Sequence, residues 1–308
     1  MRILVLGAGG VGGYFGGRLA EKGADVTFLV RSRRKRQLES DGLVIRSVHG
    51  DVTIRPKTIT AEEPVNAPYD LVLFSSKAYH LEEAVRDLRP FVGERTVVLP
   101  LLNGVAHYPV LQREFGADRV IGGLCFIETT LNQEGHVIQT SKDHFVRFGE
   151  FGQSQSQTER IRRIEQALGG TKASFLLSDH IERDIWHKYL FIAVIAGITT
   201  LMRSPVGPIR ETTGGTEFIR SVFREIEAVM LAHGAPLDGD IVDRHMETTQ
   251  RMSFEMKSSM LRDMEKGYAV EGEHLHGYLL ELAERQGLEA PRLQAIYHNL
   301  KVYGSGLS

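Results

Sequence analysis

The glycine-rich segment near the N-terminus constrains the fold of this chain more than any other feature. Gly7, Gly9 and Gly12 form the pattern GxGxxG directly after the apolar run 3–6, and a helical pattern follows. In that setting the first glycine permits a tight turn, the second lets a pyrophosphate approach the backbone, and the third lets the helix pack closely on the strand. The helix N-terminus then offers free N–H groups and a positive dipole end to the phosphates.

This pattern predicts that residues 1–31 form the first βαβ unit of a Rossmann fold and bind a nicotinamide dinucleotide. The residues expected to contact the cofactor are Gly7, Ala8, Gly9, Gly10, Val11 and Gly12. A similar turn in an unrelated α/β fold, such as a flavin-binding protein, is the alternative.

The residue at the end of the second predicted strand indicates which nicotinamide cofactor is bound. An acidic side chain ~20 residues after the glycines would accept hydrogen bonds from the ribose hydroxyl of NAD, whereas an arginine favours the 2′-phosphate of NADP. That position holds Arg31, directly after the predicted strand at 25–30. The sequence therefore predicts NADP(H). More basic residues follow it, namely Arg33, Arg34, Lys35 and Arg36. They either contact the phosphate or form a solvated face of the protein.

The first half of the chain carries strand signals. Short continuous apolar runs are typical of parallel strands buried on both faces, and they cover 3–6, 26–30, 71–74, 97–99 and 120–124. A hairpin is expected at 44–54, and strands at 136–139 and 145–148 are expected to complete the sheet. A surface loop at 153–158, a helix at 159–168 and a strand at 173–177 are expected to follow.

The second half shows helical periodicity interrupted by Gly and Pro. The expected helices are 181–202, 217–233, 238–264, 270–286 and 292–303. We therefore predict an α/β fold in which a Rossmann domain with a doubly wound sheet (1–178) precedes an all-helical domain (179–308).

Composition favours small-molecule chemistry in a reducing compartment. The 308 residues carry a formal net charge of −2, which attracts neither nucleic acid nor an anionic membrane. The most apolar later segment, 189–202, is shorter than the ~20 residues that span a bilayer. Cys125 is the single cysteine, which excludes an intramolecular disulfide and is expected to be buried and inert. We expect a cytoplasmic protein.

Polar residues that follow two predicted strands are candidates for chemistry. Lys77 comes after the run 71–74 and Asn103 after the run 97–102. Ligands of open α/β sheets bind at the carboxyl ends of the strands. An ordinary loop lysine and a turn asparagine before glycine are the alternative interpretations.

Two charged residues of the helical half stand in apolar surroundings. Lys188 lies in a strongly apolar predicted helix, so its ammonium either snorkels outward or is desolvated for proton transfer. Glu271 enters an apolar helical face, where it could pair with a buried lysine or compensate the helix dipole. His274 and His276, two residues apart, diverge on a helix, so no metal site is expected.

The order and spacing of these motifs resemble the ketopantoate reductase family over about residues 1–291. The matching features are VLGAGGVGG, Arg31, SSKAY, LNGV, the apolar helix with Lys188, SSMLRD and Glu271. The resemblance implies that an N-terminal Rossmann domain binds NADPH, that a helical domain closes over it, and that 2-dehydropantoate is reduced to pantoate in pantothenate biosynthesis.

Site roles follow from the same resemblance. It implies that Lys188 is the general acid, that Asn103 contacts nicotinamide and substrate, and that Lys77 lies near them in the cleft. It also implies that Ser259 binds the substrate and that Glu271 lies near the cofactor and the catalytic lysine.

One region departs from the family pattern. Asparagines that typically hold the substrate are replaced by Ile192, Ala196 and Val206. Losing these donors weakens the case for a hydroxylated acid, and a less polar 2-oxo acid or ketone becomes the alternative substrate. Two further readings stay open: a dehydrogenase that oxidises another hydroxy acid or polyol, and an NADPH sensor without turnover. A homodimer is the expected assembly.

Overall fold

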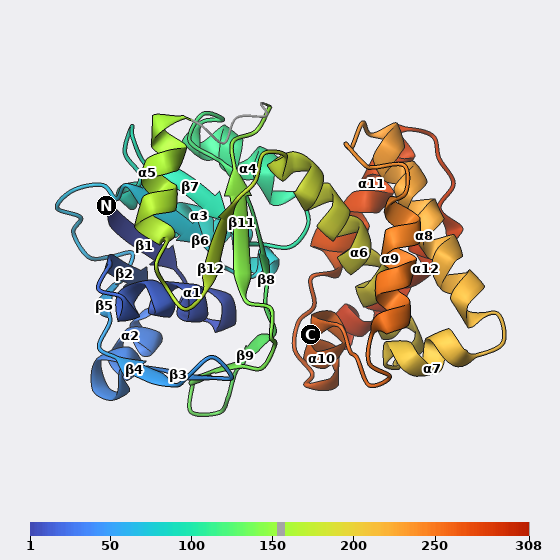
Figure 1. Cartoon of the computed structure of the whole chain (residues 1–308), viewed down its shortest axis with the longest axis horizontal. Coiled ribbons are helices and arrows are strands. Elements are labelled where there is room, and N and C mark those ends of the chain that lie inside the picture. Colours follow the sequence, from blue (N-terminus) through green and yellow to red (C-terminus); the bar gives the residue numbers. More distant parts are fainter. Residues whose placement is uncertain (153–157, 308) are drawn as a thin grey trace. The chain divides into compact units, whose positions relative to one another are not determined.

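The chain folds into two compact units. The computed structural model describes residues 1–152 and 158–307, so the loop expected at 153–158 lies almost wholly outside the described residues. The first unit, which we call the Rossmann-like unit, comprises Met1–Leu102 and His107–Ile181. The second, the helical unit, comprises Asn103–Ala106 and Glu182–Ser308. Figure 1 shows the sheets of the first and the helices of the second.

A five-stranded parallel sheet forms the centre of the Rossmann-like unit. Its strand order is β5-β2-β1-β6-β7, with β1 (Arg2–Leu6), β2 (Asp25–Leu29), β5 (Lys57–Ile59), β6 (Leu71–Phe74) and β7 (Val97–Pro100). The chain leaves β1 toward β2, whereas β6 lies on the other side of β1. The topological switch point, where open sheets of this kind bind ligands, therefore lies at the carboxyl ends of β1 and β6.

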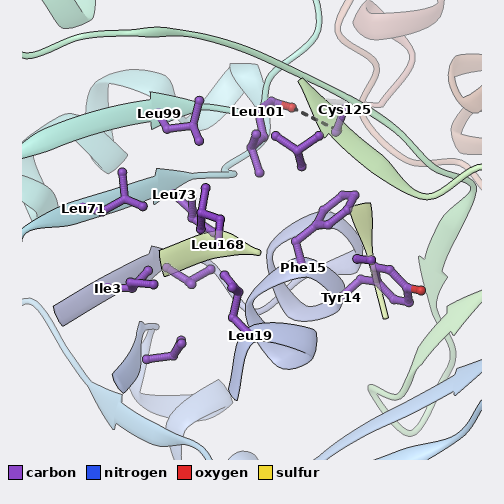
Figure 2. Close-up of a cluster of buried hydrophobic side chains, with 14 of the residues drawn as sticks. Ile3, Tyr14, Phe15, Leu19, Leu71, Leu73, Leu99, Leu101, Cys125 and Leu168 are labelled. Carbon is purple, nitrogen blue, oxygen red and sulfur yellow. Dashed lines mark hydrogen bonds between the residues drawn. The ribbon is translucent and has the colours of Figure 1, made fainter. Parts of the chain in front are cut away.

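Helices connect the strands of this unit, and several of them contribute side chains to its core. They are α1 (Gly10–Glu21), α2 (Ser32–Asp41), η1 (Ala78–His80), α3 (Leu81–Leu88), η2 (Arg89–Phe91), α4 (His107–Phe115) and α5 (Glu159–Leu168). Figure 2 shows Phe15 and Leu19 of α1 in the same cluster as Leu73 of β6 and Leu168 of α5. Cys125 is buried in this cluster, as predicted.

Seven further strands of the described residues form two smaller sheets outside the parallel one. The predicted hairpin is confirmed as β3 (Leu43–Ser47) and β4 (Val52–Ile54). It belongs to a second sheet, β4-β3-β10-β9, with β9 (Thr129–Leu131) and β10 (Val137–Gln139). A third sheet, β12-β11-β8, contains β8 (Gly122–Phe126), β11 (Phe145–Gly149) and β12 (Ser174–Leu177).

The expectation that 136–139 and 145–148 complete the parallel sheet is wrong. β10 pairs with β3 and β9, and β11 pairs with β8 and β12. The burial of β11 is interrupted by an exposed residue, whereas β6 and β7 are buried at every position. A strand that exposes one face to solvent suits a smaller sheet with an antiparallel pair. A strand buried on both faces suits the central parallel sheet.

In the described part of the helical unit, all regular secondary structure is helical. The helices are α6 (Ile181–Met202), α7 (Val206–Glu211), α8 (Gly215–Ala232), α9 (Ile241–Arg251), α10 (Ser259–Glu265), the π-helix η3 (Glu273–Gly277), α11 (Tyr278–Arg285) and α12 (Pro291–Ser305). The predicted α/β class, with a Rossmann-like first half and a helical second half, is confirmed.

Two of the predicted helices differ from those observed. The helix expected at 238–264 is broken into α9 and α10, because the backbone between them pairs with the start of α7. The N–H groups of Val206 and Gly207 donate to the carbonyls of Met256 and Phe254 at 2.9 and 3.0 Å. The helix expected at 270–286 begins with the π-helix η3 rather than with α-helical turns.

Helix α6 is longer than the apolar segment 189–202, which forms its C-terminal part. Its 22 residues could cross a membrane by length and composition alone. However, 72% of its most apolar stretch is buried inside the protein, as in the core helix of a soluble protein. We therefore interpret α6 as the central helix of its unit.

Candidate active site

The glycine-rich turn joins β1 to α1 at the switch point. Gly7 adopts φ +92°, a left-handed conformation that glycine reaches without steric cost, and its N–H donates to Leu29 O at 3.0 Å. Gly9 is the N-cap of the 12-residue helix α1 and provides no side-chain cap. The helix therefore presents N–H groups of its first turn that no capping side chain satisfies, which is a suitable site for an anion.

Two glycines of this turn test whether a dinucleotide fits. A Cβ at Gly12 would lie 2.1 Å from Ser75 Oγ and 2.2 Å from Gly7 O, so this glycine is required for packing within the protein. A Cβ at Gly9 would meet no heavy atom within 4 Å. The backbone of Gly9 thus faces open space, as the approach of a pyrophosphate requires. The turn fits the predicted cofactor.

The basic segment after β2 divides into residues with different partners. Arg31 is the N-cap of α2, its side chain is 63% exposed, and its guanidinium forms an ion pair with Glu83 at 2.5 Å. Arg34 instead turns back and donates to Ala8 O in the glycine-rich turn at 3.1 Å. Lys35 forms an ion pair with Glu63. Arg31 is therefore exposed and paired with a carboxylate, whereas Arg34 supports the turn, a difference that the sequence did not reveal.

Lys77 and Asn103 follow neighbouring strands of the sheet, as expected. Lys77 comes after β6, at the start of η1, and is exposed. Asn103 comes shortly after β7 in the chain but is grouped with the helical unit. Each therefore stands beyond the carboxyl end of a strand, which is where such sheets place functional residues.

The ammonium of Lys188 is held inside the helical unit. Lys188 lies on α6 and is only 8% exposed, so it does not snorkel into solvent. Its Nζ donates to Asn103 Oδ1 at 2.8 Å. A buried ammonium needs polar partners, and the amide of Asn103 is one of them. The structure thus brings together two of the predicted site residues that are far apart in sequence.

The π-helix η3 adds a histidine to this pair. His274 Nε2 donates to the main-chain oxygen of Asn103 at 3.0 Å. Burial lowers the pKa of His274, and the negative charge of Glu271 opposes part of that shift. Glu271 itself is half-buried and lies two residues before the first residue of η3. Sequence reasoning expected His274 and His276 to diverge, and they do, since His276 Nε2 donates to Ala193 O of α6 at 2.8 Å.

The serine implied by the resemblance has a neighbour with a structural role. Ser258 is buried, caps α10 by accepting from Leu261 N at 3.0 Å, and shares a hydrogen bond of 2.7 Å with Thr199 Oγ1. Ser259 is the first residue of α10 and is exposed. The exposed hydroxyl is the one suited to a ligand.

The face of α6 that carries Lys188 continues with apolar side chains. Ile192 and Ala196 follow it at intervals of four residues, so the three share one side of the helix. Ile192 is half-buried, whereas Ala196 and Val206 are 5% and 0% exposed. Beyond its ammonium, this face offers hydrocarbon rather than hydrogen-bond donors.

Comparisons with known proteins identify the family of this chain. The model of the family described as "Ketopantoate reductase PanE/ApbA" matches residues 3–153, and that of its C-terminal domain matches residues 180–304. The chain is also similar to an uncharacterized oxidoreductase, YkpB, of Bacillus subtilis (strain 168). The two are 48% identical over 303 residues, which cover 98% of this chain and 99% of that protein.

Solved structures extend the similarity to the fold. A crystal structure of 2-dehydropantoate 2-reductase from Geobacter metallireducens GS-15 has 28% identity and a TM-score of 0.87, covering 98% of this chain and 99% of that one. A ternary structure of D-mandelate dehydrogenase with NADH and anilino(oxo)acetate has a TM-score of 0.88 and covers 100% and 99% of the two chains. Its identity is 18%, so this second likeness shows the fold alone.

Proposed function

The chain belongs to the ketopantoate reductase family of NADP-dependent oxidoreductases, and we propose that it reduces 2-dehydropantoate to pantoate. The observation that carries the proposal is the buried ammonium of Lys188, held by Asn103 at 2.8 Å. Such a pair suits the protonation of an oxyanion that forms when a carbonyl is reduced. We place the protein in the cytoplasm, with a homodimer as its expected assembly.

The proposed cofactor site uses residues of the Rossmann-like unit. The backbone from Gly7 to Gly12 and the N-terminus of α1 would hold the pyrophosphate, and Arg31 would contact the 2′-phosphate. Lys77, beyond β6, would lie near the nicotinamide end. When bound, NADPH supplies the hydride that reduces the carbonyl carbon.

The proposed proton donor and substrate contacts come from the helical unit. Lys188 gives a proton to the carbonyl oxygen as negative charge develops there. Asn103 orients the ammonium and contacts the nicotinamide and the substrate. Ser259 binds the substrate, and Glu271 acts near the cofactor and the lysine. A general acid in such a position contributes about 10²–10⁴-fold to the rate.

The apolar face beyond Lys188 favours a second substrate class for the same reaction. Ile192, Ala196 and Val206 provide no donors for the hydroxyl of 2-dehydropantoate. A hydrophobic site neither gains much from an added hydroxyl nor strongly rejects it, whereas a site built to bind a hydroxyl rejects the analogue that lacks it. The second candidate is therefore a 2-oxo acid with an apolar side chain.

A matched pair of substrates separates these candidates. The pair is 2-dehydropantoate and 3,3-dimethyl-2-oxobutanoate, which differ by one hydroxyl group, and the assay follows NADPH absorbance. Preference for 2-dehydropantoate by well over tenfold in kcat/KM supports the first candidate, and a ratio near or below unity supports the second. In the second case Ile192→Asn should raise the ratio about tenfold, because one hydrogen bond to the hydroxyl is restored.

The same assay addresses the two remaining readings. Faster turnover of hydroxy acids or polyols with NADP⁺ than of any 2-oxo acid with NADPH would identify a dehydrogenase that works oxidatively. NADPH binding without NADPH oxidation across a broad panel of 2-oxo acids would reject the proposed function. That result would favour an NADPH sensor without turnover.

A further inference from the structure

The π-helix η3 stands at the junction of the residues that hold Lys188. π-Helical turns are rare, and they occur often at functional sites because they displace side chains and carbonyls from their α-helical positions. Within the described parts of the chain, η3 is the one π-helix. It begins two residues after Glu271 and contains His274 and His276. Two sets of contacts connect η3 to the turn at Asn103 and to helix α6.

The first set of contacts fixes the turn that bears the amide. His274 Nε2 donates to Asn103 O at 3.0 Å. The next residue, Gly104, has φ +78°, and a Cβ there would lie 2.9 Å from Leu275 Cδ2. The turn therefore needs glycine both for its backbone conformation and for its close approach to η3.

The second set of contacts ties η3 to the helix that bears the ammonium. The hydroxyl of Tyr189, the neighbour of Lys188 on α6, donates to Leu275 O. Tyr189 is fully buried. The π-helix is thus bonded on one side to the Asn103 backbone and on the other to α6, the two elements whose side chains meet in the Lys188–Asn103 hydrogen bond.

We propose that His274 is a positioning residue for the proton donor: its Nε2–H holds the main chain of Asn103, so that the Asn103 amide holds the ammonium of Lys188. The inference rests on the proposed role of Lys188. An amide anchored at its own backbone loses less conformational freedom when it binds the ammonium, and the hydrogen bond is correspondingly stronger.

The interaction does not require a charged imidazole. Burial lowers the pKa of His274, and Nε2 carries a proton both in the imidazolium and in the neutral tautomer that this hydrogen bond selects. A side chain that is never charged but presents an N–H at a similar distance can therefore replace it. Glutamine meets that requirement and leucine does not.

The test compares His274→Gln, His274→Leu and the control His276→Gln. His276 lies in the same π-helix and also donates to a main-chain oxygen, but that oxygen belongs to Ala193 on α6. For each variant we would measure kcat, KM, the Kd for NADPH, and the rate at which acetic anhydride acetylates Lys188, followed by peptide mass spectrometry. The acetylation rate reports how firmly the ammonium is held and needs no turnover.

For His274→Leu we expect kcat to fall about tenfold, with the Kd for NADPH unchanged and acetylation of Lys188 several-fold faster, as for the loss of one hydrogen bond. His274→Gln should recover most of the lost kcat. His276→Gln should keep kcat within about twofold, even if it unfolds at a lower temperature, because its bond does not reach Asn103. In an Asn103→Ala background, His274→Leu should lower kcat by less than about twofold, since residues that act through one another are not additive.

Several results would overturn the inference. They are wild-type kcat in His274→Leu, equal impairment of the Gln and Leu variants, an equal loss in His276→Gln, or full additivity with Asn103→Ala. Unchanged acetylation of Lys188 in His274→Leu would do the same whatever the turnover. If the wild type reduces no 2-oxo acid, the proposed function fails, and the acetylation rates alone decide whether His274 holds the lysine.

Discussion

Replacement of Lys188 should separate its contribution to catalysis from its contribution to stability. We expect Lys188→Met to lower kcat at least about 10²-fold, the lower end of the contribution of a general acid. That loss corresponds to about 2.7 kcal/mol of transition-state stabilisation. The Kd for NADPH should stay nearly constant, because the proposed cofactor contacts belong to other residues.

Two opposing effects determine how Lys188→Met should change the free energy of unfolding. Lys188 is 8% exposed and donates to Asn103 Oδ1 at 2.8 Å. Removing the ammonium eliminates the cost of burying a charge, which is several kcal/mol per ion. It also removes a charge-assisted hydrogen bond worth about 1.5–3 kcal/mol. Since methionine fills a similar volume, the free energy of unfolding should change by less than about 2 kcal/mol in either direction.

Lys188→Arg is the matched control, because it keeps a positive charge and N–H donors but does not release a proton near neutral pH. Steady-state kinetics should show a loss comparable to that of Lys188→Met. Urea unfolding of all three proteins provides the stability comparison. Turnover within tenfold of the wild type in Lys188→Arg would show that charge alone suffices, and normal turnover in Lys188→Met would remove the lysine from the mechanism.

Three further predictions concern the cofactor turn and acid stability. Arg31→Ala should weaken NADPH binding by about 1.5 kcal/mol and NADH binding little; equal losses in titrations with both cofactors would argue against a 2′-phosphate contact. Gly9→Ala should keep the wild-type Tm but lower NADPH affinity at least about tenfold by blocking close approach, whereas Gly12→Ala should lower Tm; calorimetry and cofactor titration would reveal the reverse pattern if the turn were misassigned. Burial lowers the pKa of His276 to about 4, so the unfolded chain takes up the proton first, and stability that is complete above pH ~6.5 should decline by about 2 kcal/mol at pH 5. His276→Gln should lose that much less between pH 7 and pH 5 in urea unfolding, and an identical decline would exclude His276 as the cause.

The features that could be predicted from sequence are those set by local chemistry. The glycine turn depends on adjacent residues, so its context of strand, turn and helix was sufficient to place Gly7 and Gly12. The bounds of α6 were predicted correctly because Ser204 and Pro205 interrupt the apolar pattern just after it. The hairpin β3–β4 likewise surrounds its predicted turn.

The features that were missed depend on distant partners. Nothing near residue 188 shows that its ammonium meets an amide 85 positions away, so the local sequence left both snorkelling and burial open. The break after α9 arises because Phe254 and Met256 accept hydrogen bonds from the start of α7. The π-helix was not predicted either: residues 270–286 show ordinary helical periodicity, and the contacts of η3 are made with the distant residues Asn103 and Tyr189.

The arrangement of the helical unit suggests how the reaction can persist while the substrate changes. In the proposed reaction Lys188 and Asn103 act on a carbonyl oxygen, a group that every 2-oxo acid shares, and the hydrogen bond between them does not involve Ile192 or Ala196. Ile192, one turn further along, is placed to contact whatever the acid carries beyond that carbonyl. Substitutions at such a position alter which side chains are accepted, by roughly 1–3 kcal/mol for each methylene-sized group, without disturbing the proton donor. Membership of the family therefore supports the reaction type more strongly than it supports pantoate as the product.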